Sequence, residues 1–436
     1  MQGIAYWIEK RASINPRRIA VITDQEQLTY KELNESIQNA ALFLLNELKV
    51  KKGDRISIIS QNRLEYVVLL FAIARLQCIA VPLNIRLNIN ELIFQLQDSG
   101  TSILAAEEPF FEMAKSIEKE TGVKLFSIEK LNDIKQKDAE LPDEEIDEND
   151  PYIICYTSGT TGKPKGAVLR QSNMYWNAIN NILAIDLTSM DRSMVLLPLF
   201  HIGGIGLFAL PTLFVGGTII IPGKFDPYKA IEMIEKHQAT VVMGVPSIHQ
   251  ALLDCPAFNV ADLSSVRWFY SGGAPCPREL IQAFTDKGYL LGQGFGLTET
   301  SPTVFMLSRE DARRKKGSIG KPVLFSEVKL VDEEGNEVRP GEVGNLLVRG
   351  PIVMKEYWNR PEATNEAIKD GWFHTGDLAR TDDEGFFYIV GRKKEMIISG
   401  GENIYPLEVE QVINQLPEVR EAAVVGISDP RWGEVP

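Results

Sequence analysis

The first 150 residues alternate between short apolar runs and longer amphipathic segments, and this alternation limits the possible folds most strongly. A helix is predicted to start at Thr29, because Glu32 completes a capping box three residues later and one apolar face follows. Residues 55–60 predict a strand, "LEYVVLLFAIARLQ" (64–77) a helix and "CIAVPLN" (78–84) another strand. Strands that alternate with helices favour a parallel sheet with helices packed on it. The sequence therefore predicts α/β architecture.

The pattern changes twice further along the chain. Residues 138–150 hold eight acidic side chains in thirteen and predict a solvated connector. From about residue 317, short runs with tight turns, such as "EVKLVDEEGNEVRPGEVGNLLVRG" (327–350), indicate a small antiparallel or barrel-like unit. We expect a large domain over 1–393, made of two α/β subdomains (1–180 and 181–316) and a β-barrel-like part (317–393). A helix and a strand within 394–436 predict the start of a small α+β domain that is incomplete.

Charge and cysteine content exclude several classes of function. A formal net charge of −13 and a pI near 5.1 argue against nucleic acid as a partner, which needs a clustered basic surface. The four cysteines, Cys78, Cys155, Cys255 and Cys276, form no C-x-x-C pair and predict buried, reduced thiols. No signal stretch is recognisable at the N-terminus, and prolines, glycines or polar residues interrupt the longest apolar runs. We expect a cytoplasmic protein without a transmembrane segment, which leaves peripheral membrane contact and a homodimer open.

The stretch "YTSGTTGKPKGA" (156–167) combines glycines, hydroxyls and lysines behind a strand-like apolar lead. It is not a P-loop, because Lys163 is followed by a proline rather than by the hydroxyl residue that binds magnesium. The glycines nevertheless allow close backbone approach, and the polar groups can surround a polyphosphate. From composition alone, a flexible surface loop remains the alternative.

The same loop resembles the signature of the adenylate-forming superfamily, which includes acyl-CoA synthetases, aryl-CoA ligases, luciferases and peptide-synthetase adenylation domains. Five further stretches match in order: "GGAP" (272–275), "GFGLTET" (294–300), "GWFHTGD" (371–377), "GRKKE" (391–395) and "SGGENIYPLEVE" (399–410). The resemblance covers nearly the whole chain and is closest to bacterial fatty acyl-CoA ligases. It implies an enzyme that activates a carboxylic acid with ATP and Mg²⁺ to acyl-AMP, and then transfers the acyl group to coenzyme A.

The resemblance implies a site for the phosphates. Glu299 would bind Mg²⁺ and Thr298 would contact the α-phosphate, although a Thr-Glu pair can also cap a helix. Phosphate-binding residues in the loop would be Thr157, Ser158, Gly159, Thr160, Thr161, Gly162 and Lys165.

The remaining matches imply sites for the nucleoside. Phe295 stands where the family usually has tyrosine and would stack on adenine beside Gly296. The opposite wall would be formed by Gly273, Ala274 and Pro275. Asp377 would accept hydrogen bonds from the ribose hydroxyls, with Arg392 beside it, although a Gly-Asp pair alone more commonly marks a turn.

Three further positions relate to the second half of the reaction. Lys394 matches the family's hinge between its large and small domains. Gly400 and Gly401 match the channel for the pantetheine arm of coenzyme A. The family also ends its small domain with a lysine that contacts the substrate carboxylate, and no residue here matches it, so we expect this sequence to stop short of that position.

The substrate is predicted from "LLPLFHIGGIGLFALPTLF" (196–214), in which His201 is the one ionisable residue. A lone histidine in such a stretch is more often a core residue, but the resemblance places it beside the substrate carboxylate. Peptide-synthetase domains carry an aspartate here to pair with an ammonium, and its absence disfavours amino acids. We expect an apolar acid, most simply a medium- or long-chain fatty acid. An aryl or o-succinylbenzoate CoA ligase, an oxidising luciferase-like enzyme and a non-catalytic nucleotide-binding relative stay open.

Overall fold

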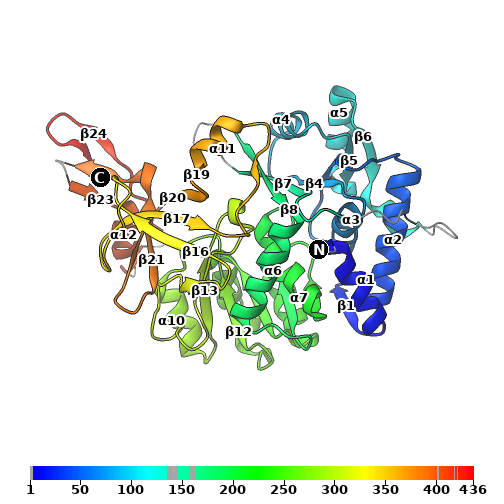
Figure 1. Ribbon diagram of the computed structural model, residues 1–436. Helices are drawn as coiled ribbons and strands as arrows, with labels where there is room; N and C mark the ends of the chain where they lie inside the picture. The colour runs from blue at the N-terminus through cyan, green and yellow to red at the C-terminus, as the bar shows by residue number, and fades with distance from the viewer. Residues whose placement is uncertain are drawn as a thin grey trace.

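The computed structural model describes residues 3–134, 141, 146–157, 163–399, 402–416, 418–419 and 421–436. The chain folds into α/β layers at its N-terminal end, an antiparallel sheet and a small C-terminal sheet (Figure 1). The predicted α/β class is therefore confirmed.

A seven-stranded sheet forms the first layer, in the order β18-β8-β7-β4-β3-β5-β6. The strands are β3 (Arg55–Ile59), β4 (Ile79–Pro82), β5 (Ile103–Ala106), β6 (Lys124–Ser127), β7 (Pro151–Thr157), β8 (Lys165–Arg170) and β18 (Glu356–Tyr357). β3 to β7 run parallel, as the sequence predicts, whereas β8 and β18 run antiparallel to their neighbours.

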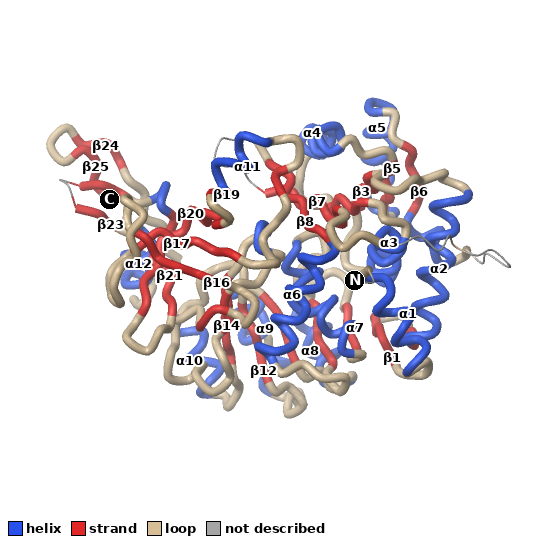
Figure 2. The backbone as a smooth tube through the Cα atoms, viewed as in Figure 1, coloured by secondary structure: helices blue, strands red, loops and turns tan. Residues whose placement is uncertain are grey.

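Helices cover this sheet, and α1, α2 and α3 pack on one another (Figure 2). They are α1 (Ile4–Ile14), α2 (Tyr30–Asn46), α3 (Leu64–Arg75), α4 (Ile89–Ser99), α5 (Phe111–Thr121) and α6 (Gln171–Ile185), with short turns at η1 (Glu108–Phe110) and η2 (Ile128–Asn132). The capping box predicted for α2 is present, since the Thr29 hydroxyl accepts from the Glu32 amide and the Glu32 carboxylate accepts from the Thr29 amide.

The second layer is a nine-stranded sheet in the order β15-β14-β13-β12-β11-β9-β10-β1-β2. Its strands are β1 (Ile19–Thr23), β2 (Gln27–Thr29), β9 (Arg192–Val195), β10 (Thr218–Ile221), β11 (Val241–Gly244), β12 (Trp268–Ser271), β13 (Leu291–Phe295), β14 (Phe305–Met306) and β15 (Lys321–Pro322). The intervening helices are α7 (Leu210–Val215), α8 (Pro227–Lys236), α9 (Pro246–Asp254) and α10 (Arg278–Asp286), with η3 (Gly204–Ala209), η4 (Pro256–Asn259) and η5 (Thr298–Thr300).

One pairing in this layer crosses the predicted subdomain border. β1 lies beside β10, with Val21 opposite Ile219, so the N-terminal hairpin belongs to the second sheet although its flanking helices pack with the first. The borders predicted at residues 180, 316 and 393 remain predictions.

The antiparallel sheet begins after residue 326, which confirms the change of pattern seen in the sequence. It contains β16 (Glu327–Val331), β17 (Gly344–Arg349), β19 (Ile368–Lys369), β20 (Trp372–Thr381) and β21 (Phe387–Arg392), and α11 (Pro361–Ala367) precedes β19. The strand order β16-β17-β20-β19 is open, with β16 and β19 at its ends. A closed barrel would have no such edge strands.

η6 (Lys393–Glu395) connects this sheet to the C-terminal one (Figure 1). The C-terminal sheet has the order β23-β22-β25-β24 and contains β22 (Ile397–Ser399), β23 (Glu402–Ile404), β24 (Ile427–Asp429) and β25 (Gly433–Val435), with α12 (Pro406–Ile413). The apolar stretch "AAVVGI" (422–427) could supply the strand expected within 394–436, but regular strand pairing starts only at Ile427, and Val425 is 69% exposed.

Two predictions about the chain as a whole can be compared with this structure. All four cysteines are free and buried, as expected. Among the described helices, none combines the length and the apolar character that crossing a bilayer requires.

Candidate active site

One cavity of about 1320 Å³ lies where the two large sheets meet the antiparallel sheet. Strand ends and connections from all three sheets line it, because residues at the carboxyl ends of parallel strands converge on one edge. Residues predicted from the sequence that line it are Thr157, Lys165, His201, Gly273, Phe295, Gly296, Thr298, Glu299 and Arg392. The structure therefore gathers side chains that are up to 235 residues apart in sequence.

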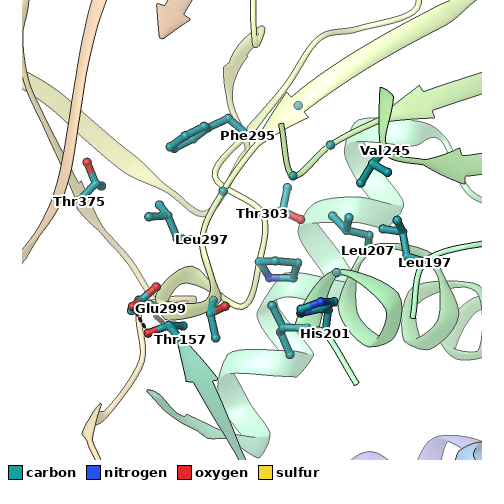
Figure 3. Close-up of a pocket in the computed structure, with 18 of the residues that line it drawn as sticks. Thr157, Leu197, His201, Leu207, Val245, Phe295, Leu297, Glu299, Thr303 and Thr375 are labelled. Carbon is teal, nitrogen blue, oxygen red and sulfur yellow. Dashed lines mark hydrogen bonds between the residues drawn. The ribbon is translucent and has the colours of Figure 1, made fainter. Parts of the chain in front are cut away.

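Glu299 is the buried carboxylate at one end of this cavity. Its side chain comes from η5, the residue is 8% exposed, and Oε1 accepts hydrogen bonds from the Tyr357 phenol at 2.8 Å and the Thr157 hydroxyl at 3.4 Å. Figure 3 shows Thr157 and Glu299 joined in this way. Thr298, beside Glu299, also lines the cavity. Two hydroxyl donors thus orient a carboxylate that faces the open space.

The predicted phosphate loop leaves β7 at Thr157 and returns at Lys165, the first residue of β8. The Lys165 ammonium lies 5.4 Å from the centre of the Tyr357 ring, within cation–π range. The intervening candidates, Ser158, Gly159, Thr160, Thr161 and Gly162, lie outside the described residues. Thr157 lies opposite Lys165 in the β7–β8 pairing. The start of the loop therefore contacts Glu299 through Thr157, and its end contacts Tyr357 through Lys165.

The candidate adenine wall is formed by Phe295, at the end of β13, and by Gly272 and Gly273, which follow the neighbouring strand β12 and line the same cavity. Gly296 is required for this geometry, because a Cβ atom there would lie 1.6 Å from the Pro302 carbonyl oxygen. Ala274 and Pro275 are exposed, and neither lines the cavity. The structure therefore brings Phe295 and Gly273 to the cavity but not Ala274 and Pro275.

Asp377 and Arg392 face each other on the paired strands β20 and β21. Arg392 Nε lies 2.8 Å from Asp377 Oδ1, while Asp377 Oδ2 is buried and has no hydrogen-bond partner among the described residues. Burial raises the pKa of Asp377 to about 6, with Arg392 lowering it and the Glu299 charge raising it. Arg392 lines the cavity directly, whereas Asp377, 3% exposed, lies just behind it. A buried unpartnered carboxylate oxygen is costly unless a ligand donates to it.

The other end of the cavity is apolar. Leu196, Leu197, Leu207 and Met306 line it and are buried, and the partly buried Val245 lies beside them. In Figure 3, Leu197, Leu207 and Val245 lie on the opposite side of the view from Glu299. Such a wall accepts an apolar group at one end of a ligand whose other end meets the polar residues.

His201 precedes η3 and is exposed at the wall of the cavity, so it is not the core residue that composition favours. Its ring centre lies 4.6 Å from that of Phe200. Partial burial and the charge of Arg86 lower the pKa of His201 below its usual 6.5. The imidazole is therefore largely neutral at pH 7.

Lys394 lies in η6, between β21 and the first strand of the C-terminal sheet, and is exposed. Its neighbour Lys393 lines the cavity and pairs with Glu333 at 2.7 Å. The candidates Gly400 and Gly401 lie outside the described residues.

A magnesium ion fits this chemistry only as a partner of phosphate. Within the described ranges, no three Asp, Glu, His or Cys side chains gather into a site that could hold a metal ion by themselves. Mg²⁺ typically uses one or two carboxylates together with substrate phosphates and water. Glu299, buried but facing the cavity, is suited to that role.

Some residues at the site were not predicted from the sequence. Tyr357 lies outside all six matched stretches. Its place at the site is recognised only from its contacts with Glu299 and Lys165 in the folded chain. Asn173 and Asn177 on α6 bind backbone around the site: Asn173 Nδ2 donates to the Val353 carbonyl at 2.9 Å and Asn177 Nδ2 to the Gly206 carbonyl at 2.7 Å. An amphipathic pattern gives no sign of such buried amides.

Comparison with known proteins gives consistent results. A family model described as AMP-binding enzyme matches residues 8–358, and one described as AMP-binding enzyme C-terminal domain matches residues 408–436. A feruloyl-CoA synthase from Amycolatopsis sp is 42% identical over 434 residues, covering 100% of this chain and 87% of that protein. The long-chain-fatty-acid–CoA ligase FadD13 from Mycobacterium tuberculosis is 35% identical, covering 100% of this chain and 88% of that protein.

A solved structure shows the ligands of one relative. The o-succinylbenzoate coenzyme A synthetase from Bacillus subtilis, in complex with ATP and magnesium ion, aligns with a TM-score of 0.88 and 35% identity over 99% of this chain and 88% of that one. Similarity of this extent covers both the large sheets and the C-terminal sheet.

Proposed function

This chain belongs to the AMP-binding enzyme family, and we propose that it is an acid–thiol ligase that joins an apolar carboxylic acid to coenzyme A through an acyl-adenylate. One observation carries this proposal: a single cavity holds a buried carboxylate and a lysine at one end and an apolar wall at the other. The polar end suits a nucleoside triphosphate, and the apolar end suits the body of the acid.

In the first step, a carboxylate oxygen of the acid attacks the α-phosphorus of ATP, and the bond to the leaving pyrophosphate breaks. Lys165 and Thr157 stabilise the charge that the leaving group gains. Thr298 holds the α-phosphate, and Glu299 is the protein ligand for magnesium. Mg²⁺, when bound, neutralises charge on the phosphate oxygens.

Nucleoside recognition is assigned to the opposite walls of the same cavity. The adenine ring lies between Phe295 and the backbone at Gly273. The ribose hydroxyls donate to Asp377, whose free Oδ2 supplies the acceptor, while Arg392 holds Oδ1. The unpartnered oxygen supports this assignment, since a ribose hydroxyl satisfies it.

In the second step, the thiol of coenzyme A loses its proton to solvent, its sulfur attacks the acyl carbon, and AMP leaves with the bonding electrons. We assign Lys394 as the hinge that lets the C-terminal sheet turn between the steps, because it lies at the only described connection between that sheet and the rest. His201, neutral and open to the cavity, lies on the path of the acyl group. Gly400 and Gly401 are proposed to line the thiol channel.

Two classes of acid fit the apolar wall. The fatty acid predicted from the sequence gains about 0.8 kcal/mol for each buried methylene. An aromatic acid is the second candidate, because the feruloyl-CoA synthase has the higher identity to this chain and Phe200 and Tyr270 line the same wall.

The test is acid-dependent release of pyrophosphate, measured with fatty acids of increasing length, hydroxycinnamates, indole acids, o-succinylbenzoate and amino acids. Activity with an apolar acid and its loss in Glu299→Gln support the proposal. Preference for an amino acid contradicts it. ATP binding without pyrophosphate release for any acid identifies a non-catalytic nucleotide-binding relative instead.

A further inference from the structure

The segment 351–360, here called the strap, crosses the candidate nucleotide site between η5 and β8. On one side, the Ser301 hydroxyl donates to the Ile352 carbonyl at 2.7 Å, and the Met354 amide donates to the Glu299 carbonyl at 2.8 Å. The strap is thus attached to the backbone that carries the candidate metal ligand.

On its other side the strap pairs with β8, which carries Lys165. β18 runs antiparallel to β8 with Tyr357 opposite Ala167, and the Trp358 amide donates to the Gly166 carbonyl at 2.7 Å. The strap therefore joins β8 of the first sheet to η5, which lies between β13 and β14 of the second sheet, and each of these two elements presents one charged residue of the site.

Tyr357 is the strap residue that contacts both charged side chains. Its phenol donates to Glu299 Oε1 at 2.8 Å, and its ring lies 5.4 Å from the Lys165 ammonium. An ordinary phenol is protonated at neutral pH, so the Tyr357 hydroxyl is a hydrogen-bond donor. The ring and the hydroxyl act on different partners, which allows their effects to be separated.

A second set of bonds fixes the far end of the strap. The carboxylate of Asp98, 10% exposed, accepts from the Tyr156 phenol at 2.8 Å and forms an ion pair with Arg360. The Asp98 carbonyl also accepts from Trp358 Nε1 at 3.2 Å. Tyr156 directly precedes Thr157, so this junction links the start of the phosphate loop to the strap.

We propose that Tyr357 is a positioning residue that presets the Glu299 carboxylate for a magnesium ion and the Lys165 ammonium for the phosphates. The inference rests on the proposed function, since it concerns the same nucleotide site. Partners that orient a ligating carboxylate contribute about 10–100-fold in metal affinity.

The experiment compares Tyr357→Phe with Tyr357→Leu in the full chain. The control is Tyr388→Phe, which removes a 3.2 Å phenol–carboxylate bond to Asp382 away from the cavity. Two affinities are measured: that of Mn²⁺ for the complex with a non-hydrolysable ATP analogue, by electron paramagnetic resonance, and that of the analogue alone, by calorimetry.

We expect Tyr357→Phe to weaken Mn²⁺ binding about 10-fold and to leave metal-free analogue binding unchanged, because the ring still supports Lys165. Tyr357→Leu should also weaken metal-free binding, by about 3-fold. The Mg²⁺ needed for half-maximal pyrophosphate release should rise with the Mn²⁺ constant, while the KM for the acid stays constant. Tyr388→Phe should match the parent protein.

Equal Mn²⁺ affinity in Tyr357→Phe and the parent overturns the proposal, as does equal metal-free binding in all three variants. If Tyr357→Phe does not melt cooperatively, Tyr156→Phe replaces it, with a smaller loss of Mn²⁺ affinity expected and no loss as the contradicting result. A parent protein that releases no pyrophosphate with any acid refutes the proposed function, while the Mn²⁺ titration still tests the role of Tyr357.

Discussion

Arg392 Nε lies 2.8 Å from one carboxylate oxygen of Asp377, and the other oxygen of Asp377 is buried with no partner among the described residues. The guanidinium favours the charged carboxylate, whereas burial opposes it. Because the effect of burial is larger, the pKa of Asp377 rises to about 6. The carboxyl group therefore titrates close to physiological pH, which makes its role measurable.

The affinity for ATP should fall as pH drops below about 6, because protonated Asp377 is a poorer acceptor for the ribose hydroxyls. Asp377→Ala should weaken ATP binding by about 1–3 kcal/mol at pH 7.5 and remove this dependence. Calorimetric titration with ATP from pH 5 to 8 measures both effects. The same pH profile in the parent and in Asp377→Ala would exclude Asp377 as the titrating group.

The free energy of unfolding of the ligand-free protein should also depend on the ionisation of Asp377. Because its pKa is raised, this dependence on pH has the opposite sign to that of an aspartate whose pKa is lowered in the folded state. The folded pKa of Asp377, about 6, exceeds the ordinary aspartate pKa of 3.8, so the folded state retains the proton more strongly. The resulting stabilisation is present below about pH 4 and is lost as pH rises to 6, at up to about 1.4 kcal/mol per pH unit. The difference in unfolding free energy between the parent and Asp377→Asn, measured with urea across this range, should show that slope. A flat difference would contradict the raised pKa.

Glu299→Gln should leave the fold intact, because an amide oxygen still accepts from Tyr357 and Thr157. The loss of the negative charge should lower magnesium-dependent pyrophosphate release by at least ~10²-fold. Raising the Mg²⁺ concentration should recover part of the rate if the residue binds the metal. Release at the parent rate in a normally folded variant would remove Glu299 from the metal site.

Gly296→Ala should destabilise the protein by about 1–3 kcal/mol or more, since the new Cβ would lie 1.6 Å from the Pro302 carbonyl oxygen. The matched control is Gly391→Ala, where a Cβ meets nothing within 4 Å. Thermal melts of both variants test the difference. Equal melting temperatures would show that the loop from Thr298 to Thr303 can shift without cost.

Asn177→Ala should cost about 1–3 kcal/mol for each backbone group it leaves unpaired. Its amide donates to the Gly206 carbonyl at 2.7 Å and accepts from the Thr303 amide at 3.2 Å, and the residue is fully buried. Asn90→Ala, on the exposed face of α4, serves as the control and should stay within about 0.5 kcal/mol of the parent. Urea unfolding that does not distinguish the two variants would contradict the role assigned to Asn177.

Much of the architecture could be predicted from local patterns in the sequence. The box at Thr29 and Glu32 and the strand–helix alternation up to residue 157 depend on neighbouring residues, and both are confirmed. The place of β1 could not be predicted, because its partner β10 is nearly 200 residues away and no local pattern records that pairing.

The candidate site shows the same division. Motif resemblance located Glu299, Lys165, Phe295 and Arg392, and the structure brings them to one cavity. Tyr357 escaped prediction because its importance arises from two contacts made only after distant strands pair. Ala274 and Pro275 match a motif but lie outside the cavity, which shows that a sequence match does not determine how each residue faces.

The pairing of Val21 with Ile219 also bears on how the chain reaches its folded state on the ribosome. At about 5–20 residues per second, the β1–β2 hairpin emerges roughly 10–40 seconds before β10 is synthesised. During that interval one edge of β1 offers unpaired amide and carbonyl groups, and its apolar side chains lack their cover. The N-terminal hairpin is therefore exposed to mispairing in the nascent protein, and slow translation would prolong that exposure.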